Sequence, residues 1–194
     1  EYYGLEKRPV KVYEPYQMLG LIEEDLKQAM GVDTEAAAGR DTLFGFPNED
    51  WKEYRLDSGQ EVLVSKHFNV TKDEKGVTYI YPQGDTRCEP SGHMPHGGFY
   101  FDAIERGGEV DDDELNVEDN LEEYAEFTDA DVEYLKGEIL RAHATGRAVV
   151  GSFGGTGLGD VAFIPGMALK HPKGIRGVEE WYVSTVIRRE FVHE

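Results

Sequence analysis

Apolar residues recur at helical spacing in three parts of the chain. Over residues 19–30 the apolar positions are spaced three or four apart, and Gly31 follows where a helix commonly ends. Thr128 and Asp131 have the spacing of a capping box, which predicts a helix over about 129–143. Residues 179–194 are again amphipathic. We therefore expect three helices, two of them in the last third of the chain.

The middle of the chain changes to a period of two, which is typical of strands. Val62, Val64, Phe68 and Val70 fall on alternating positions, with turn-forming residues on either side. This pattern predicts a three-stranded antiparallel meander over residues 51–82, followed by a loop over 83–98. Residues 42–102 therefore read as an insertion between segments of α/β type.

Two further segments are expected to be parallel strands. The short apolar run Ala148–Val150 is typical of a buried parallel strand, and it leads directly into a glycine-rich loop. The second segment, residues 32–38, precedes Arg40 and Asp41. Adjacent parallel strands bring their carboxyl ends to one edge, where α/β proteins bind ligands. The sequence thus predicts one pocket between the two loops, and the alternative is that each loop fills space on a different side.

The glycine-rich loop supplies four candidate ligand-binding residues, Gly154, Gly155, Thr156 and Asp160. The order Gly154-Gly-Thr-Gly-Leu-Gly159 does not fit the dinucleotide-binding fingerprint, and no phosphate-loop lysine follows it. Its backbone N–H groups can form an anion nest, or the glycines can simply permit a tight turn. Asp160 is either a ligand contact or a cap.

Arg40 and Asp41 are the other candidate site residues. Arg40 can pair with a ligand carboxylate through two parallel hydrogen bonds, and Asp41 can accept N–H groups. A structural ion pair or a cap is the alternative for both residues. Cys88, His93 and His96 could supply three zinc ligands, but their spacing is not that of a standard structural site. No metal site is assigned to the chain.

Composition narrows the classes of partner. The chain has 194 residues and a formal net charge of −19, and such an acidic surface repels nucleic-acid phosphates. No apolar stretch has the length of a membrane span, and no signal peptide is visible. The lone Cys88 excludes an internal disulfide and fits a reducing cytoplasm. The expected partner is a small-molecule substrate.

Several longer segments resemble one branch of the uroporphyrinogen decarboxylase superfamily, described as decarboxylase-like or methyltransferase-like. The resemblance covers roughly residues 1–194, and the segments that carry it are Arg40–Trp51, Ile80–Thr86, Gly97–Asp102, Ala148–Gly166 and His171–Tyr182. It implies an α/β fold, the N-terminal part of a (β/α)8 TIM-type barrel with the antiparallel insertion at 42–102. A complete barrel needs about 250 residues, so we expect this chain to be a piece of a longer protein.

The resemblance also implies an activity. In the decarboxylases an aspartate after the first barrel strand binds pyrrole N–H groups, and Asp41 lies near that position. These enzymes carry a tyrosine shortly after the glycine-rich loop, whereas no tyrosine occurs between Gly154 and His171. The first hypothesis is therefore a methyltransferase that uses zinc and a corrinoid protein. The alternatives are a uroporphyrinogen decarboxylase without a cofactor, and a non-catalytic binding or assembly module that forms a homo-oligomer.

Overall fold

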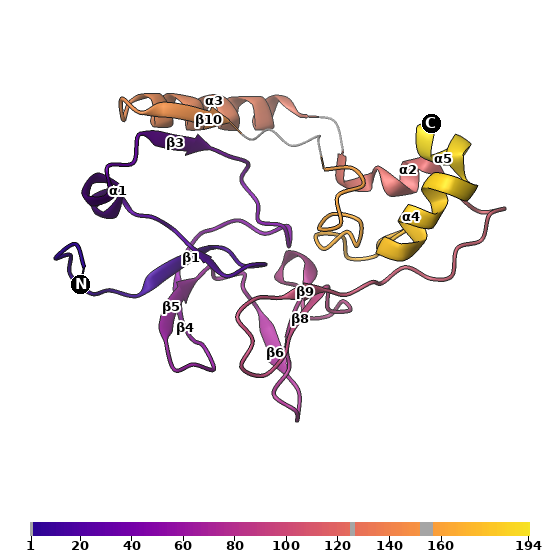
Figure 1. Cartoon of the computed structure of the whole chain (residues 1–194), viewed down its shortest axis with the longest axis horizontal. Coiled ribbons are helices and arrows are strands. Elements are labelled where there is room, and N and C mark those ends of the chain that lie inside the picture. Colours follow the sequence, from indigo (N-terminus) through magenta and orange to yellow (C-terminus); the bar gives the residue numbers. More distant parts are fainter. Residues whose placement is uncertain (1, 125–126, 152–156) are drawn as a thin grey trace.

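The computed structural model describes residues 2–124, 127–151 and 157–194 as a mixed α/β structure (Figure 1). The strands are β1 (Val10–Glu14), β2 (Leu19–Gly20), β3 (Thr34–Ala37), β4 (Lys52–Arg55), β5 (Glu61–Val64), β6 (Val70–Lys72), β7 (Thr78–Ile80), β8 (Gly92–Met94), β9 (Asp102–Ala103) and β10 (Ala148–Gly151). The α-helices are α1 (Glu24–Met30), α2 (Val117–Asn120), α3 (Asp129–His143), α4 (Val178–Ile187) and α5 (Arg189–His193). Single 3-10 turns occur at η1 (Pro82–Gly84) and η2 (Glu122–Tyr124).

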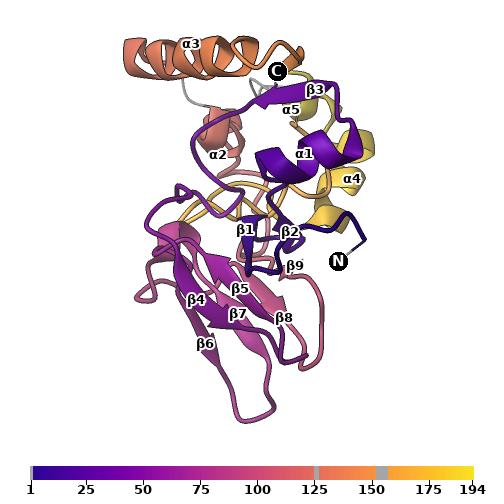
Figure 2. The same ribbon diagram turned by 90° about the vertical axis from the view of Figure 1, so that its left-hand side faces the viewer.

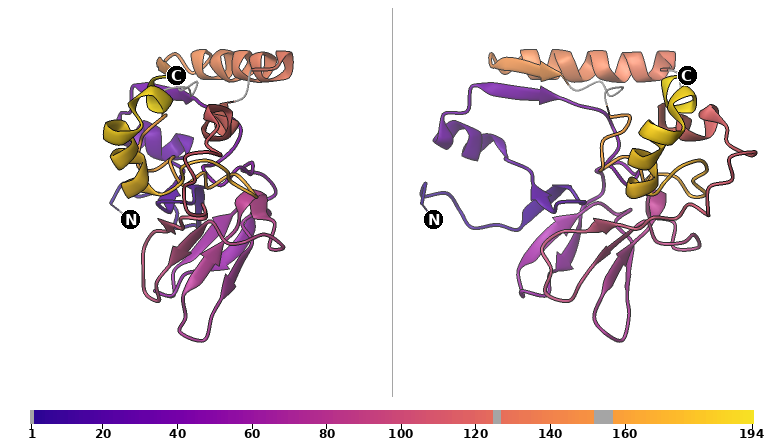
Figure 3. Two further views of the ribbon diagram at one scale, coloured as in Figure 1. Left: turned by 90° about the vertical axis from the view of Figure 1, so that its right-hand side faces the viewer. Right: turned by 45° about the vertical axis from the view of Figure 1, so that its right-hand side comes forward.

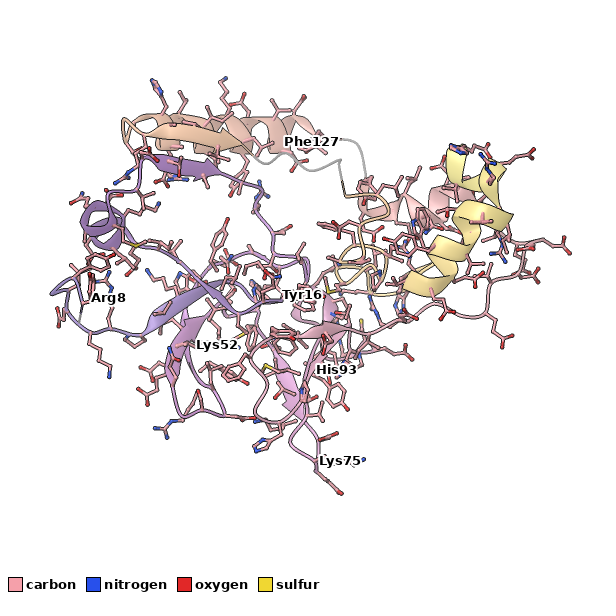
Figure 4. The ribbon with its side chains drawn as sticks, viewed as in Figure 1. Arg8, Tyr16, Lys52, Lys75, His93 and Phe127 are labelled. Atoms are coloured by element: carbon pink, nitrogen blue, oxygen red, sulfur yellow. The ribbon has the colours of Figure 1, made fainter. Side chains whose placement is uncertain are left out.

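Two small sheets enclose the main hydrophobic core. One has the strand order β2-β1-β5-β4 and the other β6-β7-β8-β9, and both lie in the lower half of the molecule (Figure 2). The largest side chains of this core are fully buried and include Phe44, Phe46, Val64, Ile80 and Phe101. Alternate residues of β5 point inward, because successive side chains of a strand face opposite sides. Tyr16, labelled in Figure 4, packs edge-on against Phe44.

A separate two-stranded sheet lies at the other end of the molecule, under α3. Here β3 and β10 are parallel neighbours, with Thr34 beside Ala148 and Ala37 beside Gly151. Helix α3 packs against both strands, as the ribbon shows (Figure 1). It begins with the expected capping box, in which the Thr128 and Asp131 side chains each bond the other's backbone N–H. This sheet and helix form a layer that we call the α3 layer.

The C-terminal third builds a second, smaller core. Ile164, Ile175 and Trp181 are buried together in this core, and Trp181 belongs to α4. The ribbon shows the C-terminal helices near α2 (Figure 3). The Arg176 guanidinium, 2% exposed, pairs with Glu123 at 2.7 Å and donates to the backbone carbonyl of Asp119. A buried arginine is stable only when its donors are satisfied, so this cluster fixes the chain after Gly166 onto η2.

The expected barrel fold is wrong for this structure. A barrel alternates parallel strands with helices, whereas in the described residues most strand pairs are antiparallel. Residues 42–102 fold into short strands joined by turns, which close hairpins locally and leave no crossover helices. A parallel strand–helix–strand arrangement is confined to β3, α3 and β10. A second parallel pair, β1 with β5, spans only Val10–Lys11 and Val62–Leu63.

Several expected elements differ in detail. The helix over 19–30 is shorter, because Leu19 and Gly20 pair with β1 and α1 begins at Glu24. The single meander is instead two hairpins in different sheets, β4–β5 and β6–β7, and the expected loop 83–98 contains β8. The C-terminal helix is divided into α4 and α5 at Arg188. No helix in the described part of the chain has both the length and the apolar character needed to cross a bilayer.

Candidate functional site

A cleft of about 930 Å³ lies along the free edge of β3 in the described structure. Thr34 and Ala36 of β3 line it, together with Tyr134 and Arg141 of α3. Residues of α1 and of the segment around Pro47 close the other sides. The cleft thus lies between the α3 layer and the sheet that contains β1.

A buried carboxylate holds this cleft together. Glu35 is only 6% exposed, and Lys27 donates to both of its oxygens at 2.8 and 2.7 Å. Arg141 contacts one oxygen at 3.1 Å, and Arg147 lies 3.5 Å from the other. These hydrogen bonds, led by the bond from Lys27, hold the pKa of Glu35 below its usual range. Since the cations come from α1, α3 and the start of β10, Glu35 joins three elements to β3.

The arginines beside Glu35 also bond backbone carbonyls of β3 and of the segment that precedes it. Arg141 donates to the Ala36 carbonyl at 2.8 Å, on the strand edge that faces the cleft. Arg147 donates to the Val32 carbonyl at 3.0 Å and forms two bonds to Glu24, the shorter of 2.6 Å. Both guanidinium groups are therefore engaged in hydrogen bonds within the fold.

Arg40 differs from the other cations of the cleft. Its guanidinium lies over the ring of Tyr134, 4.7 Å from the ring centroid, which is a cation–π contact. Within the described ranges no carboxylate lies within 4.0 Å of it, whereas Lys27 and Arg141 are both paired. Burial and the nearby Glu138 raise the pKa of Tyr134, so this phenol stays protonated. Arg40 and Tyr134 together offer N–H and O–H donors at one end of the cleft.

Two acidic residues of the cleft, Glu23 and Glu49, are paired with cations that do not line it. Glu23 is paired with Arg8 and Lys11, and Glu49 with Lys66 and His67. Figure 4 shows Arg8 on the α1 side of the molecule. Hydrogen bonds from these partners lower the pKa values of both carboxyls, led by Lys11 at Glu23 and by His67 at Glu49. The cleft lining is therefore less repulsive to an anion than its glutamates suggest.

The other expected site residues lie elsewhere or outside the described ranges. Asp41 is exposed, forms an isolated bridge with Pro47 and is not among the cleft-lining residues. Asp160 is also exposed, and its carboxylate accepts the Ala162 N–H at 2.9 Å as a local cap. Gly154, Gly155 and Thr156 lie outside the described residues. The expected parallel pairing of β3 with β10 is confirmed, so the two strands end at the same edge of their sheet.

The three candidate zinc ligands are not gathered into a metal site. His96 contacts Asp57 at 3.0 Å, and His93 lies in β8, in the lower sheet of Figure 4. Cys88 is a free thiol. Over residues 2–124, 127–151 and 157–194 no group of three His, Cys, Asp or Glu side chains is placed to hold a metal ion. Cys88, His93 and His96 therefore do not form a site that fits zinc.

Sequence reasoning did not find Glu35, Lys27, Arg141 or Tyr134. One signal for Glu35 was available, because a charge inside the small-residue strand Thr34-Glu-Ala-Ala37 must be paired if that strand is buried. Its partners could not be located in the same way, since Arg141 and Arg147 lie more than a hundred residues along the chain. Their proximity depends on the parallel pairing of β3 with β10.

The chain matches no family model, and comparisons with curated proteins and with solved structures give no match. The resemblance to the uroporphyrinogen decarboxylase superfamily therefore stays a hypothesis that rests on the sequence segments alone.

Proposed function

We propose that the cleft along β3 binds a small molecule that carries a carboxylate, and that Arg40 pairs with this group. The observation that carries the proposal is the position of Arg40, which is stacked on Tyr134 with no carboxylate partner among the described residues. A guanidinium held over a ring is already oriented, so less entropy is lost when it binds an anion. Tyr134 supplies a second donor, and Thr34 with Ala36 supplies an uncharged wall.

The activity that we propose is that of a methyltransferase-like enzyme of the uroporphyrinogen decarboxylase superfamily, acting in the cytoplasm. The sequence resemblance supports this proposal, and so does the missing tyrosine after the glycine-rich loop. Enzymes of this kind use zinc and a corrinoid protein as methyl carrier. In this proposal Arg40 and Tyr134 bind and orient the carboxylated substrate.

Decarboxylation of uroporphyrinogen is the second candidate. It is favoured by the position of Asp41, an exposed carboxylate that directly follows Arg40 at the end of β3. An aspartate there can accept pyrrole N–H groups while arginine holds a carboxylate side chain of the same ligand. This candidate needs no metal or cofactor.

A titration of the chain with uroporphyrin, a stable polycarboxylate, tests the binding site. The quenching of porphyrin fluorescence by wild type is compared with that by Arg40→Ala. The matched control is Arg55→Ala, since Arg55 is an exposed arginine on β4, 72% exposed and remote from the cleft lining. We expect Arg40→Ala to weaken binding roughly 10- to 100-fold, the size of a charge-assisted hydrogen bond, and Arg55→Ala to change it less than about twofold.

Two activity assays then distinguish the reactions. Methyl transfer is followed with methylcobalamin and a thiol acceptor, and decarboxylation by porphyrin fluorescence after incubation with uroporphyrinogen. Turnover in the first assay supports the methyltransferase, and turnover in the second alone supports the decarboxylase. Equal affinity of wild type and Arg40→Ala for uroporphyrin would contradict the proposal that Arg40 binds a carboxylate in this cleft.

A further inference from the structure

The strand β10 has an unusual environment for a parallel strand. It is the apolar segment Ala148–Gly151, and all four residues are exposed. Val149 is 37% and Val150 is 55% exposed. Parallel strands are normally covered on both faces and paired on both edges, and an apolar free edge promotes pairing with another strand. β10 therefore has the character of an internal strand but is at the edge of its sheet.

The unpaired backbone groups of β10 can be assigned from its register. The Ala148 N–H donates to the Asp33 carbonyl at 2.9 Å, so the groups of Ala148 and Val150 point toward β3. Strand alternation then directs the Val149 N–H and C=O away from β3. In the described ranges neither group has a hydrogen-bond partner. Val149 is thus the centre of an open hydrogen-bonding edge.

Helix α3 extends its apolar side past this edge. Its buried face contains Ala142 and the half-buried Leu135, which lie over the sheet. Tyr134 and Arg141 lie to one side of that face, toward the cleft at the free edge of β3. Val132 and Ile139 lie on the opposite side of it, because each residue turns the helix by about 100°. They are 52% and 39% exposed, so this side of α3 is open to solvent on the β10 side of the layer.

We propose that a second copy of this chain pairs with β10, antiparallel and across a twofold axis at Val149. A twofold axis places Val149 opposite its own copy, where the two residues exchange both N–H···O=C bonds. The strand order becomes β3-β10-β10-β3. Each α3 lies over its own strand pair, so the helices are two strand spacings, or about 10 Å, apart. That is the packing distance of two helices, and Val132 and Ile139 from both copies fill the space between them.

The charge of the chain gives this dimer a distinctive salt dependence. Two copies with a formal net charge of −19 repel each other, whereas Val149, Val132 and Ile139, which meet in this dimer, are apolar. Salt screens the repulsion and leaves the apolar contact and the backbone hydrogen bonds in place. The dimer should therefore become tighter as salt is raised from about 0.1 M to about 1 M, unlike a dimer held by ion pairs.

Sedimentation velocity over a roughly hundredfold range of protein concentration tests the proposal. Val149→Pro removes the outward N–H and leaves the groups that bond β3 in place, while its control Val149→Thr keeps the N–H. Val132→Lys places a charge in the space between the helices. Its control is Val186→Lys on α4, where the valine is 71% exposed and remote from β10.

We expect wild type and both controls to dimerise alike, and Val149→Pro and Val132→Lys to raise the dissociation constant at least roughly tenfold. Circular dichroism verifies that each variant is folded. If Val149→Pro does not fold, Val132→Lys decides the matter, because its position on the exposed side of α3 tolerates a charge. A wild type that stays monomeric over the whole range, or dimers unaffected by both substitutions, would overturn the proposal.

Discussion

At the scale of single residues, Glu35 is the side chain on which the cleft most depends. Removing its charge leaves Lys27, Arg141 and Arg147 close together without their shared carboxylate. Breaking a buried ion pair by removing one partner is strongly destabilising, so Glu35→Gln should lower the free energy of unfolding by about 2 kcal/mol or more. Urea denaturation measures it. The control is Glu133→Gln in α3, where the carboxylate is 72% exposed. This substitution should lower the free energy of unfolding by less than about 0.5 kcal/mol.

The same carboxylate gives stability a defined pH dependence. Its pKa is lower in the folded chain than the ordinary value of 4.5 because Lys27 and then Arg141 donate to the ionised form. At acid pH the unfolded chain thus binds the proton first. The stabilisation is complete above about pH 5 and is lost as pH falls through the folded pKa. Between pH 5 and 3, wild type should lose more free energy of unfolding than Glu35→Gln, and parallel curves would contradict this.

At the scale of elements, local signals predicted helices better than they predicted sheet partners. The start of α3 follows from the Thr128–Asp131 capping box, which lies within four residues of sequence. The position of β10 was predicted correctly, but the prediction that it is buried was wrong, since all four of its residues are exposed. Burial depends on what lies beside the strand, which the local sequence does not show. The alternation at Val62 and Val64 identified strands, yet the sheet that each hairpin joins is decided by contacts between distant segments such as β1 and β5. The site residues depend on such contacts too.

The inward face of β5 can be tested by one substitution. Val64 is 1% exposed in the main core, so Val64→Asp buries a charge with no partner and should destabilise by at least about 3 kcal/mol. The control is Val10→Asp in the neighbouring strand β1, where the valine is 41% exposed and the carboxylate can reach water. Thermal denaturation compares the two. Similar melting temperatures would mean that β5 does not present Val64 to the core.

At the scale of the whole molecule, the parts are held by different forces. The sheets of β1–β2 and β4–β9 share a core of buried aromatic and aliphatic side chains. The α3 layer instead buries small residues, Ala37 and Ala142, and is joined to the rest through the Lys27–Glu35 and Arg147–Glu24 pairs. The Arg147–Glu24 pair is partly exposed and is screened by salt, whereas the buried Lys27–Glu35 pair and apolar burial are affected much less. The α3 layer should therefore be the less stable part.

This difference predicts an order of opening that amide hydrogen exchange can measure. Segments with few apolar contacts open locally at a lower free energy than the global unfolding reaction. Amides of α3 and β10 should exchange faster than those of β5 and β7, and salt at about 1 M should speed exchange in α3 while β7 changes little. Glu35→Gln should also speed amide exchange in α3.

The measurement must be made at concentrations where the chain is monomeric, since pairing at β10 would protect the same amides. If α3 then exchanged as slowly as β7 at both salt concentrations, the two parts would unfold as one cooperative unit, and the ion pairs around Glu35 would not limit the stability of the layer.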